Sequence, residues 1–150
     1  MKRLILVSFL VTAVTGVLWS ADVADRTVYR SRVVPIFFLV EAVGIVGIWS
    51  KDIAGGALSD GFFAAKENGT LFWPHLTAEF LTAGALGAGA VGLLLETDWS
   101  RPVSFLALGA LGYTATSNLG WALAERERLP YAIPMLIGLA GAAVSFVILW

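Results

Sequence analysis

The sequence contains no cysteine and only one histidine, and these two absences exclude several kinds of chemistry. Without cysteine there can be no disulfide, no thiolate nucleophile, no iron–sulfur cluster and no cysteine-ligated zinc. With one histidine the chain cannot hold a haem between two of its own imidazoles, although a haem shared with a partner subunit stays open. We therefore expect no intrinsic cofactor and no metal site.

Charged residues are also scarce: they make up 14% of the 150 residues, against about 25% in an average soluble domain. Hydrophobic residues account for 58%, and the mean hydropathy is +0.81, which is typical of a protein that lies in a bilayer. The net charge of −1 supplies no basic field, so nucleic-acid binding is excluded. A chain of this length predicts a single domain, residues 1–150.

Five apolar segments come close to the length of about 20 residues that a helix needs to cross a bilayer. Their apolar character shows no period-two alternation, which favours helices over the strands of a barrel. The sequence therefore predicts an all-α integral membrane protein, a bundle of five transmembrane helices over about 4–20, 33–49, 74–95, 102–124 and 130–150.

The first segment has the basic start and apolar middle of a signal peptide. Cleavage after Ala21 or Ala24 would place Trp19 or Asp22 where a small neutral residue is required, so we expect a retained helix. In that topology six Lys and Arg residues lie on the side of the N-terminus and four on the other. This excess favours a cytoplasmic N-terminus in the plasma (inner) membrane.

All six tryptophans lie at or near the ends of the predicted spans, where indoles favour the headgroup zone: Trp19, Trp49, Trp73, Trp99, Trp121 and Trp150. The only long connection, residues 50–73, contains "SDGFFAAKENG", which predicts a short interfacial helix with Phe62 and Phe63 in the interface. This segment is either a connector or a mobile lid.

Small residues recur four apart in the last three spans, a spacing that lets helix backbones approach closely in lipid. We expect these residues to pack the helices against one another, or to form the face of a homodimer or of a contact with another membrane subunit. They are Gly84, Ala88 and Gly92, then Gly112, Thr116 and Gly120, and finally Gly138 and Ala142.

Two carboxylates stand out, because only Glu41 and Glu79 among the 21 formally charged side chains lie well inside predicted spans. A charge at the bilayer centre costs about 2.5–3.5 kcal/mol on insertion scales, so such groups tend to face the bundle interior and to have a partner or a use. Glu41 precedes Trp49 by eight residues, or about 12 Å of helix, and Glu79 follows Pro74 by five, or about 7.5 Å.

A polar pocket can be predicted around these carboxylates. His75 and Glu79 are four residues apart and share a helix face, where they can hydrogen-bond or relay a proton, since imidazole titrates at about pH 6.5. The following span returns to the same side and carries "GYTATSN" at a matching depth. We predict one inner-leaflet pocket that is built from Glu41, His75, Glu79, Tyr113 and Asn118. The alternative is that these side chains only hold the helices together.

Catalytic signatures are absent from the sequence: it has no Gly-x-Ser-x-Gly elbow and no glycine-rich phosphate loop. The favoured function is therefore a non-enzymatic accessory subunit, or a protein that binds an apolar ligand such as a lipid or a quinone. The alternative is a proton-coupled small-molecule transporter that uses Glu41 or Glu79. A membrane enzyme, with His75 and Glu79 as acid and base on a lipid-like substrate, comes third.

Overall fold

The computed structural model of the chain describes residues 29–54, 65–124 and 129–150, and these ranges are helical apart from the short turn after Leu94 and the last residue. A π-helical turn, η2 (Tyr29–Val33), leads into α3 (Val34–Ala54), which is followed by α4 (Ala65–Leu94), α5 (Ser100–Ala124) and α6 (Leu129–Leu149). The shortest of these four helices has 21 residues. At about 1.5 Å per residue, each is as long as the hydrocarbon core is thick, about 30 Å.

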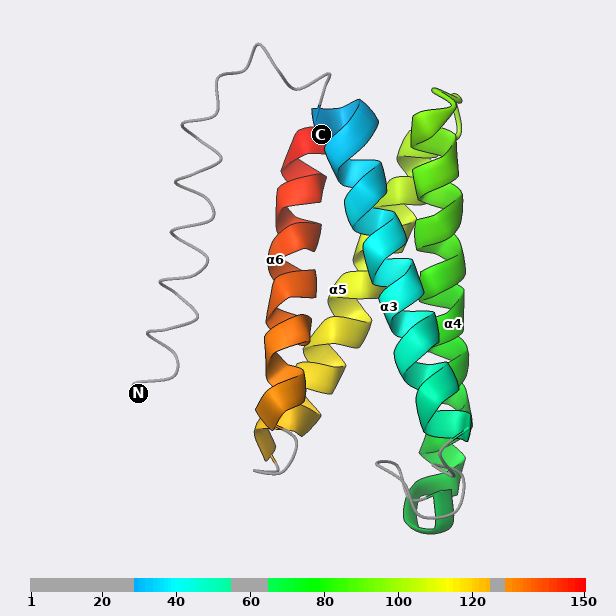
Figure 1. Cartoon of the computed structure of the whole chain (residues 1–150), viewed down its shortest axis with the longest axis vertical. Coiled ribbons are helices and arrows are strands. Elements are labelled where there is room, and N and C mark those ends of the chain that lie inside the picture. Colours follow the sequence, from blue (N-terminus) through cyan, green and yellow to red (C-terminus); the bar gives the residue numbers. More distant parts are fainter. Residues whose placement is uncertain (1–28, 55–64, 125–128) are drawn as a thin grey trace, which may run out of the picture.

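Successive helices run antiparallel, and each packs along the next (Figure 1). Contacts are extensive between α3 and α4, between α4 and α5, and between α5 and α6, but α3 and α6 meet much less closely. The bundle is therefore well packed on three sides and only loosely closed between α3 and α6.

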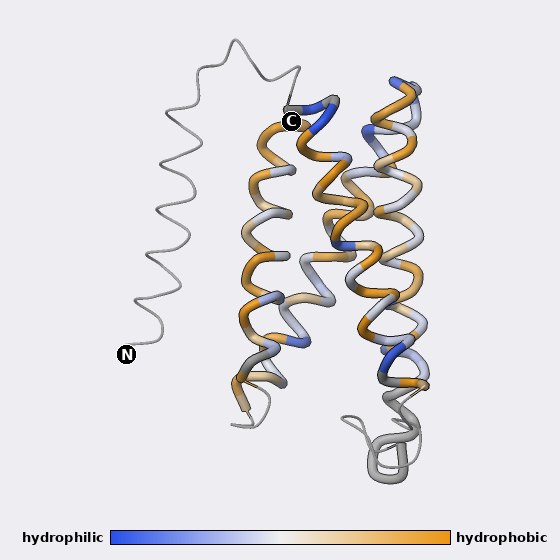
Figure 2. The backbone as a smooth tube through the Cα atoms, in the orientation of Figure 1, coloured by the Kyte–Doolittle hydropathy of each residue, from blue (hydrophilic) through white to orange (hydrophobic). Residues whose placement is uncertain are grey.

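Three of the described helices are long and apolar enough to cross a membrane, over Val34–Lys51, Trp73–Leu94 and Tyr131–Leu149. Helix α5 has the length but is less apolar, and Figure 2 shows it paler than α6. The predicted spans 33–49, 74–95, 102–124 and 130–150 are thus confirmed as helices, of which three are candidate spans. The predicted span 4–20 lies outside the described residues, so the count of five helices is not supported by them.

The third predicted span, 74–95, agrees with the candidate span Trp73–Leu94, but the helix that contains it starts earlier. Helix α4 begins at Ala65 rather than at 74 and continues through Pro74. A proline inside a helix removes one backbone hydrogen bond, which neighbouring groups in a membrane bundle can compensate. Residues 65–69 of the predicted interfacial helix therefore belong to α4, while the rest of that segment, with Phe62 and Phe63, lies outside the described residues.

The turn between α4 and α5 shows how a helix ends here without glycine. The Thr97 amide donates to the Gly92 carbonyl at 3.0 Å, and the Glu96 amide donates to the Leu93 carbonyl at 3.3 Å. This pair of bonds is a Schellman motif, which requires a left-handed residue, and Glu96 takes that conformation with φ of 54°. At the same end of the bundle, Arg101 Nη2 donates to the Leu149 carbonyl at 2.6 Å and so caps α6.

The core lies where α3, α4 and α5 meet and includes Phe38, Leu86, Ala90 and Leu108. Gly89 makes a close contact within it, where a Cβ atom would lie 3.0 Å from the Phe38 ring and 3.2 Å from Ser104 Oγ. A Cβ atom at this position would require the Phe38 ring or Ser104 to shift by a few tenths of an ångström, so glycine favours this close approach of α4 to α3 and α5.

The small residues predicted to pack the helices fall into two groups. Gly138 and Ala142 are buried on α6, and Gly92 is buried beside the Trp99 ring. The remaining small residues do not pack against another described helix. A Cβ atom built at Gly84, Gly112 or Gly120 would have nothing within 4 Å. Ala88 and Thr116 are exposed. The four-residue spacing therefore marks two stripes that face away from the described helices.

Candidate functional site

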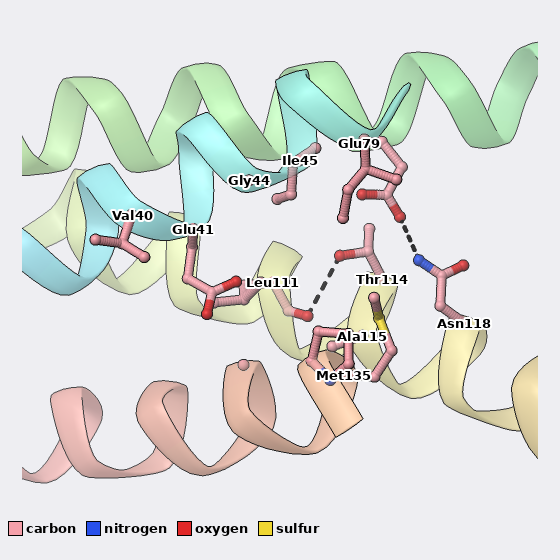
Figure 3. A pocket seen from close by; sticks show the side chains of 13 residues that line it. Val40, Glu41, Gly44, Ile45, Glu79, Leu111, Thr114, Ala115, Asn118 and Met135 are labelled. Atoms are coloured by element: carbon pink, nitrogen blue, oxygen red, sulfur yellow. Dashed lines mark hydrogen bonds between the residues drawn. The ribbon is translucent and has the colours of Figure 1, made fainter. Parts of the chain in front are cut away.

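Glu79 is the centre of a polar cluster between three helices. It lies on α4 and is only 2% exposed. Asn118, from α5, donates through Nδ2 to Glu79 Oε1 at 2.7 Å (Figure 3). The Trp49 indole, from α3, is a further hydrogen-bond donor to this carboxylate. Glu79 therefore joins α3, α4 and α5 through donors that compensate its removal from water.

His75 lies one turn before Glu79, with Nε2 at 3.5 Å from Glu79 Oε1. Its ring lies between two indoles: the centroid distance is 5.5 Å to Trp49, which is edge-on, and 5.0 Å to Trp121, which is tilted. Asn118 also interacts with the histidine side chain. The imidazole is thus held in one place by aromatic neighbours from α3 and α5.

Trp49 and Trp121 belong to this cluster, which the sequence interpretation did not foresee. Both were expected at the depth of the headgroup zone, and within the bundle Trp49 is only 6% exposed. The spacing contained a signal, because Trp121 follows Asn118 by three residues and therefore shares its helix face. Predicting that face required knowledge of which side of α5 points inward.

A half-enclosed cleft of about 200 Å³ adjoins the cluster, between α3 and α6 and over α5. Figure 3 shows the Glu41 carboxylate directed from α3 toward α5 and α6, at the opposite end of the cleft from Glu79 and Asn118. The carboxylate comes close to Gly138 on α6, where a Cβ atom would lie 3.5 Å from Glu41 Oε2. No hydrogen bond or ion pair to Glu41 is found among the described residues.

Most of the cleft wall is apolar. The residues that line it with Glu41 and Glu79 are Val40, Gly44, Ile45, Ile48, Leu111, Thr114, Ala115, Asn118, Pro134, Met135 and Gly138. The Thr114 hydroxyl donates to the Leu111 carbonyl at 3.3 Å, so it is satisfied within its own helix. The ranges that the structure describes contain no group of three His, Cys, Asp or Glu side chains that could hold a metal ion.

The five predicted pocket residues are only partly brought together. Glu41, Glu79 and Asn118 line the cleft, and His75 adjoins it through Glu79. Tyr113 does not take part, since it is 71% exposed on the outer face of α5. Its neighbour Thr114 faces the cleft instead, because the helical period that points Asn118 inward does the same for the residue four positions earlier.

The fold and the site together define a class: an all-helical protein with three candidate membrane-spanning helices and a polar-ended cleft between two of them. Comparison with known proteins adds no relative, since no protein-family model, no curated protein and no solved structure matches the chain significantly.

Proposed function

We propose that this chain is a small polytopic membrane protein that binds, without chemical conversion, an apolar molecule with a polar head, such as a lipid or a quinone. The observation that carries the proposal is the cleft, which combines apolar walls with carboxylate and amide groups at defined positions. Small-molecule sites have this composition: mostly apolar lining and a few polar groups that orient the ligand.

The position of the cleft supports entry from the lipid. Helices α3 and α6 are loosely packed against each other, and the cleft lies between them. In the topology we propose, α3 to α6 all cross the plasma (inner) membrane, residues 4–20 form a fifth span, and the N-terminus is cytoplasmic. The ligand head would then lie in the inner leaflet at one polar end of the cleft, beside Glu41 or beside Glu79 and Asn118.

An accessory-subunit role uses a different surface. The outward stripes around Gly84 and Ala88 on α4, and around Gly112 and Thr116 on α5, would serve as contacts with another subunit or with a second copy. That role requires no cleft, and the presence of one therefore favours ligand binding.

Filling the cleft tests the ligand-binding proposal. A Gly138→Leu variant is expected to bind at least about tenfold less ligand, because its side chain projects into the cleft beside Glu41. Gly138→Ala is the matched control, since its methyl group makes only ordinary contact at 3.5 Å. The measurement is mass spectrometry of the lipids and quinones retained by protein purified in lipid nanodiscs.

A second control is Gly109→Leu, which adds the same side chain at an exposed position of α5 with nothing within 4 Å. It should retain ligand like the parent protein. Equal retention by the Gly138→Leu variant would remove the support for a binding cleft.

Proton-coupled transport is the second candidate, and one observation favours it: Glu41 faces the cleft with no partner among the described residues. A carboxylate in this situation can exchange a proton for a substrate. Glu41→Gln keeps the shape and removes the charge, so flux driven by a pH gradient should fall to the background of empty proteoliposomes. Undiminished flux in this variant would exclude Glu41 as the coupling group. The control is Ser145→Ala, which is a conservative change at a buried residue of α6 that does not line the cleft.

A further inference from the structure

We infer that the ligand of the cleft is a lipophilic organic cation, with its positive head beside Glu41 and its hydrocarbon part against the apolar walls. This inference rests on the proposed ligand-binding function and names the class of ligand. Three properties of the cleft support it: the charges around it, the state of each carboxylate and the size of the cavity.

The charges around the cleft have one sign. Glu41 and Glu79 both line it, and none of the lining residues that the structure describes is a lysine or an arginine. The nearest basic residues along the chain are Arg32, in η2, and Lys51, in α3, nine and ten positions from Glu41, or about 14 and 15 Å of helix. Neither Arg32 nor Lys51 lies beside Glu41, so the negative charge in the cleft has no neighbouring cation from this part of the chain.

The two carboxylates differ in how they are compensated. Glu79 accepts hydrogen bonds from Asn118 and Trp49 and lies beside His75. Glu41 has no such partner among the described residues and faces the open part of the cleft. An ionised carboxylate without a partner is unfavourable in a site of low dielectric constant, so a bound cation is stabilised there and a bound anion is repelled.

The cavity selects an organic cation over an inorganic one. Metal cations such as Ca²⁺ or Mg²⁺ require six or more oxygen ligands or a retained shell of water. Within the described ranges the structure provides no cluster of three acidic or histidine side chains. The walls instead offer Val40, Ile48, Pro134 and Met135, and a volume of about 200 Å³ suits an alkylammonium head with part of its chain.

The test uses the full chain in nanodiscs of zwitterionic lipid and three probes with the same tail: decyltrimethylammonium, decanol and decyl sulfate. Binding is measured by isothermal titration calorimetry, with empty nanodiscs subtracted to remove partitioning into lipid. We expect saturable binding of the ammonium probe at least about tenfold tighter than of decanol, and no saturable binding of decyl sulfate. Glu41→Gln should remove this preference, and Glu41→Asp, which keeps the charge, should retain it.

Two outcomes would overturn the inference while leaving ligand binding intact. One is equal affinity for the ammonium probe and decanol, unchanged in Glu41→Gln. The other is no binding of the ammonium probe by a parent protein that retains a neutral lipid which Gly138→Leu loses. If no probe binds and the Gly138→Leu and Gly138→Ala variants retain the same lipids, the proposed function fails together with the inference.

Discussion

Replacement of Asn118 by leucine is expected to lower the free energy of unfolding by about 2–3 kcal/mol. The substitution keeps a similar volume but removes the donor at 2.7 Å from Glu79 Oε1 and leaves a carboxylate that is 2% exposed. Hydrogen bonds between membrane helices average only about 0.6 kcal/mol in double-mutant cycles. The larger value is expected here because the acceptor is a carboxylate, and bonds to charged groups contribute about 1.5–3 kcal/mol.

The measurement is reversible denaturant unfolding in mixed micelles, with Thr116→Val as the control. The Thr116 side chain is exposed, and its hydroxyl bonds only to the Gly112 carbonyl of its own helix, so little should change. The double variant Glu79→Leu/Asn118→Leu should recover most of the loss, because it leaves no buried carboxylate that lacks the Asn118 donor. If Asn118→Leu were as stable as the Thr116→Val control, the hydrogen bond between Asn118 and Glu79 would not stabilise the bundle.

Gly89→Leu is the second substitution with a large expected effect, a loss of about 3 kcal/mol or more. A side chain at this position has to enter the space occupied by the Phe38 ring, 3.0 Å from the Cβ site, and by Ser104 Oγ at 3.2 Å. Phe38 and Ser104 are both 0% exposed, so neither side chain can move out to the surface without displacing its neighbours. The helices must therefore separate, which is measured by the same unfolding experiment.

Gly84→Leu is the matched control on the same helix. Nothing lies within 4 Å of a Cβ atom at Gly84, and leucine is the better helix former by up to about 1 kcal/mol, so stability should be unchanged or slightly raised. Equal destabilisation by the two substitutions would mean that backbone effects, and not the contact with Phe38, explain the loss at Gly89.

The helices themselves were predictable because long apolar segments have few alternatives in a membrane. The predicted 33–49, 102–124 and 130–150 compare with α3 at Val34–Ala54, α5 at Ser100–Ala124 and α6 at Leu129–Leu149. The exception is α4, whose first nine residues contain Lys66, Glu67 and Asn68 and were assigned to a connection. Hydropathy marks where a helix is apolar, and a helix that extends beyond its apolar part gives no such signal.

The candidate site was predictable in part and for a definite reason. Glu41 and Glu79 stand out in any apolar sequence, and the four-residue spacing of His75 and Glu79 is a local property of one helix. Tyr113 was misplaced because "GYTATSN" has polar residues around the whole helix, so the run does not show which face is inward. The same ambiguity explains why Trp121 on α5 was not predicted to lie beside His75.

Composition and local spacing determined that this chain is helical and that much of it is suited to a bilayer. They also determined that two glutamates lie in apolar segments, where a charge is costly unless it has a partner or a function. These are properties of single segments, and the energy of placing each segment in lipid decides them. Tertiary structure decided the rest: that Gly89 and not Ala88 makes the close contact, that Trp49 and Trp121 enclose His75, and that a cleft remains between α3 and α6. Such features depend on the rotation of each helix about its axis, which packing sets and hydropathy does not encode.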